Sequence, residues 1–211
     1  MAKKFELTAE FVTNIFGKKL FRIKALMAFG DVKEGELGGY VEKEENLDHD
    51  GDAWVYGNAE VSGNARISGN ARVSGDAEVY GDAEVYGDAW VYGDAWVSGD
   101  AWVYGNARVY GNAQVSGDAQ VSGNAWVSGD AEVYGNADYA TIKGFGSERR
   151  ATTFFRLKSG EIGVRCGCFY GTIEQFRGKV KETHGDSKYA KEYLMIADLM
   201  ELHFEREEKR G

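Results

Sequence analysis

The sequence predicts an all-β solenoid, in which short strands coil around one axis and stack on one another. The motif Gly-(Asp/Asn)-Ala-x-(Val/Ile)-(Ser/Tyr) recurs in fifteen consecutive hexads from Gly51, of which the last breaks off after Ala137. No residue is inserted between the copies, and the chain contains no proline. A unit that cannot bury its own apolar face becomes stable by stacking on its copies. Without proline, every backbone N–H of the repeat can join the hydrogen bonds between stacked strands.

Each hexad predicts one short strand and one bend. The Ala and Val positions are two residues apart, so their side chains point to one side of the strand, and the x and Ser/Tyr positions point to the other. Gly accepts a positive φ, and Asp or Asn tolerates the left-handed region, which together permit a sharp corner. Three bends close a triangle, so eighteen residues make one coil and the repeat makes about five coils. At about 4.8 Å per coil, the prism is about 24 Å long.

The repeat resembles a known family. Val55-Tyr56-Gly57-Asn58-Ala59-Glu60 and its copies are similar to the hexapeptide repeat of left-handed parallel β-helix proteins. This resemblance implies left-handed coils and trimers with parallel prism axes. Many such proteins are acyltransferases that use a histidine near a coil edge, at a groove between subunits. A diverged acyltransferase is therefore one function to weigh.

The two flanks are expected to cover the ends of the stack, because an open strand ladder recruits other chains. In the first flank, Gly38-Gly39 is expected to turn the chain into a degenerate hexad, Glu45–Asp50. Leu47 would take the Ala position, and His49, at the Val position, would plug the end of the stack through hydrogen bonds. Two strands are expected before this turn: Lys4–Leu7 and Leu20–Met27. The domains are then residues 1–50, an N-terminal β-rich cap; 51–140, the hexapeptide-repeat β-helix; and 141–211, a C-terminal α+β domain.

The C-terminal part predicts a hairpin followed by two helices. Thr153–Leu157 and Ile162–Cys168 form the hairpin strands. Thr172 and Gln175 form a capping box that starts the first helix. The second helix is expected from about Ser187 to Arg206. The residues expected on its buried face are Tyr189, Tyr193, Ile196, Met200 and Phe204.

A second resemblance concerns the same region. Cys166-Gly-Cys168-Phe169-Tyr170-Gly171-Thr172, followed by Thr183-His184-Gly185-Asp186, is similar to a C-terminal domain found beside such repeats in phage and prophage proteins of unassigned role. The resemblance implies a viral origin and implies no chemistry.

Charge and composition exclude several partners. The chain carries a net charge of −9, and residues 51–138 hold nine Asp and four Glu against three Arg, which gives −10 for the prism. This acidity disfavours a groove for double-stranded nucleic acid on the prism. No apolar stretch is long enough to span a membrane, and the first residues lack a signal-peptide apolar region. Two cysteines, two residues apart, give no disulfide framework. We expect a cytoplasmic protein, of the bacterial host if phage-encoded.

A metal site is a weak candidate. Cysteine and histidine are the side chains that bind structural zinc. The Cys-Gly-Cys pair, however, lies on a predicted strand, where both thiols face one side, so buried core cysteines are favoured. We expect no cofactor. The residues of the weak candidate set are Cys166, Cys168, His184 and His203.

Catalysis is also disfavoured. General-base chemistry near pH 7 favours a group whose pKa lies near neutrality, usually histidine. The repeat contains no histidine and no loop that leaves the coil, and the three histidines stand at positions 49, 184 and 203. We therefore expect a protein that is not an enzyme.

The outward x positions carry a stronger signal. Along one face, indole and guanidinium groups alternate from coil to coil, so each Arg can lie between two indole faces at a spacing suited to cation–π contact. The residues of this face, which we call the Arg–Trp wall, are Trp54, Arg72, Trp90, Arg108 and Trp126.

Three tryptophans, Trp90, Trp96 and Trp102, form a belt around the third coil, one on each face. With the tyrosines beside them, Tyr92 and Tyr110 among these, they would expose more aromatic area than a monomer without a partner carries. Three interpretations stay open. The indoles form contacts in a homo-oligomer, for which the resemblance implies a trimer, or they line a cleft where Trp and Tyr stack on a planar group and Arg binds an anion. The third is a solvated ladder of side chains with no partner.

Three functions follow from these observations. The first is a non-catalytic phage-encoded binding protein, a counter-defence factor that sequesters a host protein or a small anionic nucleotide signal. The second is a structural or assembly scaffold. The third is the diverged acyltransferase, which rests on fold analogy alone.

Overall fold

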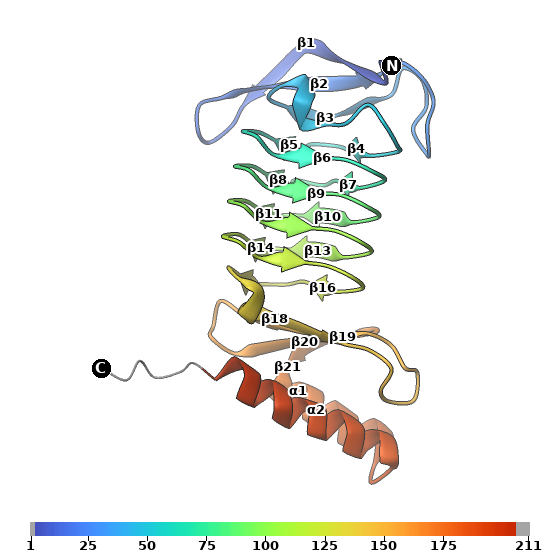
Figure 1. The fold of residues 1–211 in the computed structure, drawn as a ribbon, viewed down its shortest axis with the longest axis vertical. Helices are drawn as coiled ribbons and strands as arrows, with labels where there is room; N and C mark the ends of the chain where they lie inside the picture. Colours follow the sequence, from blue (N-terminus) through green and yellow to red (C-terminus); the bar gives the residue numbers. More distant parts are fainter. Residues whose placement is uncertain (1–2, 206–211) are drawn as a thin grey trace, which may run out of the picture.

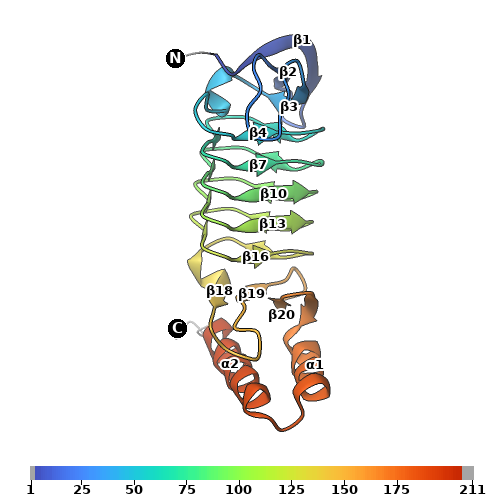
Figure 2. The same cartoon turned by 90° about the vertical axis from the view of Figure 1, so that its right-hand side faces the viewer.

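The computed structural model describes residues 3–205 and has the form of a rod. A sheet closes one end, coils of short strands fill the middle, and a second sheet with two helices closes the other end (Figures 1 and 2). The predicted solenoid of about five turns is confirmed. The strands of the coils are Trp54–Val55 (β4), Glu60–Val61 (β5), Arg66–Ile67 (β6), Arg72–Val73 (β7), Glu78–Val79 (β8), Glu84–Val85 (β9), Trp90–Gly93 (β10), Trp96–Val97 (β11), Trp102–Val103 (β12), Arg108–Gly111 (β13), Gln114–Val115 (β14), Gln120–Val121 (β15), Trp126–Val127 (β16) and Glu132–Val133 (β17).

The strands form three parallel faces. One face holds β4, β7, β10, β13 and β16, the second holds β5, β8, β11, β14 and β17, and the third holds β6, β9, β12 and β15. Hydrogen-bonded neighbours are eighteen residues apart and in register, as Val91 shows by pairing with Val73 and Val109. The predicted eighteen-residue coil is therefore present.

The Ala and Val side chains of the repeat form one continuous core. Every one of them from Ala53 to Val133 is buried, almost all completely. Burying a Val side chain contributes about 1.5–3 kcal/mol, so a stack of such layers is the main stabilising term. The corners need glycine: Gly87 has a φ of 71°, and a Cβ there would lie 3.0 Å from the Gly105 nitrogen of the next coil.

The fifteenth hexad does not continue the coil, contrary to the prediction. Residues Asn136–Asp138 form a 3₁₀ turn (η2), and Asp138 Oδ2 accepts hydrogen bonds from the N–H groups of Tyr134 and Gly135. The Val position of this hexad is Tyr139, whose ring is too large for the narrow Val column and lies half-buried beside it. The stack therefore ends after β17.

The N-terminal cap extends one face of the solenoid. Its strands are Phe5–Thr13 (β1), Lys19–Ala25 (β2) and Leu37–Val41 (β3), and β3 pairs in parallel with β5. The turn predicted at Gly38-Gly39 is wrong, because both glycines lie inside β3. A Cβ on Gly38 would lie 2.6 Å from the Val55 carbonyl oxygen. These glycines let the cap approach the first coil closely.

The degenerate hexad is displaced by two positions. Leu47 pairs with Ile67, so it takes the Val position and not the predicted Ala position. A 3₁₀ turn, Glu44–Asn46 (η1), precedes it, and the Asn46 side chain donates hydrogen bonds to Gly63 O (3.2 Å) and Ala65 O (2.8 Å). The buried amide thus replaces a strand at this end of the stack.

His49 is hydrogen-bonded, as predicted, but it does not lie at the predicted Val position, which Leu47 takes. Its Nδ1 accepts a hydrogen bond from the Lys4 N–H (3.2 Å), so Nε2 carries the proton that is donated to Glu44 Oε1 (2.7 Å). The imidazole also stacks on Phe5, with ring centroids 4.5 Å apart.

The C-terminal sheet consists of β18 (Tyr139–Ile142), β19 (Thr152–Arg156), β20 (Ile162–Cys166) and β21 (Phe169–Thr172), followed by helices α1 (Ile173–His184) and α2 (Lys188–Phe204). The predicted capping box is confirmed, since Thr172 Oγ1 accepts from the Gln175 N–H and Gln175 Oε1 accepts from the Thr172 N–H. Tyr189 is exposed, contrary to prediction, and its ring lies against His184. The other four predicted residues of this face are buried, and Arg206 lies outside the described residues.

Two stacked glutamates predict a pH-dependent gain in stability. Glu60 and Glu78 are register neighbours on one face. Burial raises the pKa of Glu78, and burial together with the Glu78 charge raises the pKa of Glu60. Glu78→Gln should therefore raise the free energy of unfolding at pH 7 by about 0.5 kcal/mol, measured by urea denaturation.

The gain should shrink as the pH falls through the raised pKa towards 4.5, because the wild-type carboxyl binds its proton more tightly in the folded state. Glu84→Gln is the matched control, since the strand neighbours of Glu84 are Arg66 and Trp102. Equal gains for the two substitutions, or a gain that persists at pH 4, would contradict the prediction.

Candidate ligand-binding site

The Arg–Trp wall is present on the face of β4, β7, β10, β13 and β16, which Figure 2 shows one above another. Trp90 pairs with Arg72 on one side and with Arg108 on the other. The Arg108 guanidinium carbon lies 4.9 Å from the rings of both Trp90 and Trp126. The Arg72 guanidinium lies 5.4 Å from the Trp90 ring. Cation–π contacts therefore run along four consecutive coils, from Arg72 to Trp126.

Trp54 is not an exposed member of the wall, contrary to the prediction. It is completely buried, because Phe5 and Phe29 of the cap pack edge-on against its ring at 6.2 and 5.3 Å. The wall thus begins at Arg72, which also donates a hydrogen bond to Asp31 (2.6 Å). That bond raises the pKa of the Arg72 guanidinium.

Arg165 of β20 extends the wall at its other end, and sequence reasoning missed it. Its guanidinium carbon lies 5.2 Å from the Trp126 ring and 5.9 Å from the Tyr110 ring. The backbone N–H of Trp126 donates a hydrogen bond to Thr153 Oγ1 (3.0 Å), which holds the last coil against the C-terminal sheet. No periodic signal marks Arg165, because it comes from outside the repeat.

The remaining aromatic residues occupy different places. Tyr92 and Tyr110 stack beside the wall with ring centroids 4.9 Å apart and planes 2° from parallel. Burial raises the pKa of Tyr92. Trp96 and Trp102 lie on the other two faces, 37% and 40% exposed, and Trp90 is 37% exposed. The predicted belt is present, one indole per face, but only Trp90 belongs to the wall.

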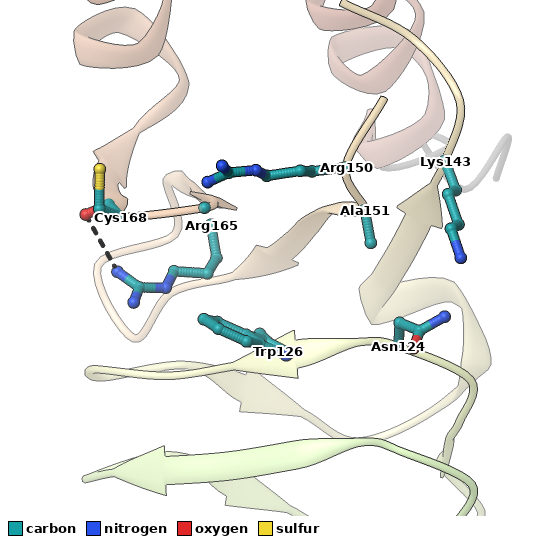
Figure 3. Close-up of a pocket in the computed structure, with 8 residues that line it drawn as sticks. Asn124, Trp126, Lys143, Arg150, Ala151, Arg165 and Cys168 are labelled. Carbon is teal, nitrogen blue, oxygen red and sulfur yellow. Dashed lines mark hydrogen bonds between the residues drawn. The ribbon is translucent and has the colours of Figure 1, made fainter. Parts of the chain in front are cut away.

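A hollow of about 540 Å³ opens where the wall meets the C-terminal region. Figure 3 shows Arg150 and Arg165 extending over Trp126 and Lys143 approaching Asn124. All three cations come from outside the repeat, so no periodic pattern in the sequence marks them. The residues that line the hollow are Asn124, Trp126, Lys143, Arg150, Ala151, Arg165, Gly167 and Cys168.

The positive charge of the hollow is poorly neutralised. Arg150 forms a long, exposed ion pair with Glu148 (3.4 Å), a geometry worth little in water. Among residues 3–205, no carboxylate lies within 4 Å of the Lys143 or Arg165 side-chain nitrogens. Arg165 Nη1 donates two long hydrogen bonds of 3.4 Å to backbone carbonyls. The buried Nε of Arg165 has no hydrogen-bond acceptor among residues 3–205. The hollow suits an anion.

The Cys-Gly-Cys segment is a turn and not a strand, contrary to the prediction. Cys166 ends β20, and Gly167, with a φ of 57°, turns the chain into β21. Cys166 is half-buried and accepts a hydrogen bond from Thr152 Oγ1 (3.2 Å), whereas Cys168 is exposed at the rim of the hollow. The expectation of two buried cysteines is therefore wrong for Cys168, because the turn points it outward.

The weak metal candidates do not form a ligand set. Cys166, Cys168 and His184, the last residue of α1, line one hollow, whereas His203 lies near the end of α2 with its ring edge-on to Phe204. Within residues 3–205, no three His, Cys, Asp or Glu side chains come together in a way that could hold a metal ion.

Comparison with known families agrees with the repeat. The family model of the YdcK beta solenoid repeat matches residues 65–81, 101–117 and 119–135. This is a repeat β-solenoid protein. The matched segments all lie inside the coils, and the search of curated proteins finds no match to the solenoid chain. Neither of its two described helices is long and apolar enough to cross a membrane.

Arg108 tests whether the wall stabilises the solenoid. Arg108→Met keeps the apolar stem and removes the charge between Trp90 and Trp126, so it should lower the free energy of unfolding by about 1 kcal/mol in chemical denaturation. Gln114→Met is the control, since Gln114 pairs with Trp96 and Glu132 on another face. Equal effects of the two changes would show that the stacked guanidinium adds nothing specific.

Proposed function

We propose that this protein is a non-catalytic binding protein whose hollow above Trp126 takes a planar, anionic ligand of nucleotide type. One observation carries the proposal: three cationic side chains gather around an indole on a protein whose net charge is −9. Acidic surfaces repel an anion that has no specific partner, so a cationic pocket in this setting favours selective binding.

The lining matches both parts of such a ligand. The Arg165 guanidinium, which lies over Trp126, offers a plane on which a flat ring can stack, and the guanidinium groups of Arg150 and Arg165 bind phosphate through two parallel hydrogen bonds. Lys143 adds a mobile point charge from the opposite side (Figure 3). Among the described residues, no His, Asp or Glu lines the hollow, so this lining offers no usual general base and favours binding over catalysis.

The wider role in this proposal is sequestration. The similarity of the Cys-Gly-Cys-Phe segment to phage and prophage proteins supports a phage-encoded protein that acts in the host cytoplasm as a counter-defence factor. A rigid binding protein removes a nucleotide signal by holding it, and this needs no reaction. The proposal stands without the phage origin, because it rests on the chemistry of the hollow.

Calorimetric titration with linear and cyclic nucleotides tests the proposal. We expect one nucleotide to bind the wild-type protein, with an affinity that falls as salt is added. Arg150→Ala combined with Arg165→Ala should weaken binding at least 30-fold, since each lost charge-assisted contact contributes about 1.5–3 kcal/mol. Arg72→Ala is the control, because Arg72 lies at the far end of the same wall and does not line the hollow. Absence of heat for every nucleotide at millimolar concentration would contradict the proposal.

A structural or assembly scaffold is the second candidate, favoured by the belt of Trp90, Trp96 and Trp102. One indole, more than a third exposed, stands on each face of the same coil. Faces that present the same large ring at the same height suit contact with further copies, including the trimer that the family resemblance implies, or with a host protein.

Light scattering tests self-assembly through the belt. If these indoles form the contact, Trp90→Ala combined with Trp96→Ala should reduce the solution mass of the wild-type oligomer, because buried aromatic anchors dominate interface energies. Tyr134→Ala serves as a control for the loss of an exposed aromatic ring outside the belt. An oligomer that keeps its mass in the double variant would exclude the belt as the contact.

A further inference from the structure

A second hollow, of about 520 Å³, lies on a different face of the solenoid, where the third face ends at β15. Within residues 3–205, none of the side chains that line it is charged. They are amides, hydroxyls and phenol rings, chiefly those of Tyr104, Gln120, Ser122, Asn124, Asn136 and Tyr139. Asn124 stands at the corner and lines both hollows.

The hollow originates from a small residue, Ser122, that follows two large ones in its column. Tyr86 and Tyr104 occupy the same position in successive coils, and their rings stack 5.0 Å apart, 5° from parallel. The next residue of this column is Ser122, which leaves the space below the Tyr104 ring empty of protein. Tyr139, which follows η2, closes the far side of the hollow.

Neutral hydrogen-bonding groups surround this space. Asn136 Oδ1 accepts from the Gln120 N–H (2.9 Å), which leaves the Asn136 amide NH₂ available. The Tyr139 hydroxyl donates to the Gln120 carbonyl. Among residues 3–205, the side-chain amides of Gln120 and Asn124 make no hydrogen bond with protein. Because β15 is the last strand of its sheet in the described part of the chain, no further strand from that part covers these groups.

We propose that this hollow binds a neutral saccharide. A sugar ring presents an apolar C–H face, which packs on phenol rings, and hydroxyls that both donate and accept hydrogen bonds, as amide and hydroxyl side chains do. An anion would find no cation in the lining. An apolar ligand would leave the amides without partners, at a cost of about 1–3 kcal/mol each.

Trp102 extends the site along the face. It pairs with Gln120 in the neighbouring strand, its indole is 40% exposed, and its ring meets Tyr86 edge-on at 6.4 Å. A chain of two or more sugar units can therefore place one unit beside Tyr104 and another on the indole. This inference goes beyond the proposed function, because the site lies on another face and takes a ligand of another chemical class.

Titration with neutral oligosaccharides tests the inference, with cellohexaose, maltohexaose and the N-acetylglucosamine hexamer as probes. Binding by at least one of them is expected, read by calorimetry and by the change in tryptophan fluorescence. Ser122→Tyr continues the Tyr86–Tyr104 column and fills the hollow, so it should weaken binding at least tenfold without lowering the melting temperature. Gln120→Ala should weaken it as well, because it removes a donor and an acceptor from the lining.

Ser98→Tyr is the matched control. The backbone N–H of Tyr80 donates to the carbonyl of Val97, so Ser98 follows Tyr80 in the same column. The substitution therefore places the same ring beneath Tyr80, in a column that does not line the hollow. Saccharide affinity should stay unchanged in this variant. If none of the three probes binds at 10 mM, the inference is overturned; a Kd of 10 mM corresponds to a binding free energy of about −2.7 kcal/mol at 25 °C. Unchanged affinity in Ser122→Tyr would overturn it as well. Nucleotide binding should survive Ser122→Tyr, so this inference and the proposed function can fail separately.

Discussion

Parallel, in-register hydrogen bonding between coils constrains every outward side chain of the solenoid. Because neighbours are eighteen residues apart, each outward position belongs to a column that runs along the axis. Trp90 lies between Arg72 and Arg108 for this reason alone. The inward Ala and Val side chains stabilise the coils, and the backbone ladder then fixes the spacing of whatever stands outside. On the coils, residues eighteen positions apart in the sequence therefore lie side by side on the surface.

The period explains what could be predicted from the sequence. The hexad directly predicts the strands, the buried Ala and Val, and the alternation of Arg108 with its two indoles. Features at the ends of the stack could not be predicted in this way. Trp54 occupies an outward x position of its hexad and would be expected to be exposed, but Phe29 of the cap covers it. Arg165 reaches Trp126 because the C-terminal sheet docks on the last coil, and no local pattern encodes that docking.

Both hollows lie where the period meets the C-terminal region. The cationic one forms because Thr153, Arg165 and Arg150 come from outside the repeat and meet the last indole of the wall. The neutral one forms because Ser122 follows two tyrosines in its column and η2 replaces a strand. Asn124 separates them at one corner. Regular coils hold the surroundings rigid, and recognition chemistry arises at the break in the repeat.

The cationic hollow depends on contact between the face that carries the Arg–Trp wall and the C-terminal sheet. The nucleotide affinity of two insertion variants tests this dependence most directly. Duplication of residues 117–134 adds a whole coil and presents a copy of Trp126 to Arg165 in the same place, so the affinity of the wild-type protein should be kept. Duplication of residues 129–134 adds one hexad and presents Glu132 there, so binding should be lost while the circular dichroism of the solenoid is unchanged. Equal nucleotide affinity in the two variants would contradict the account.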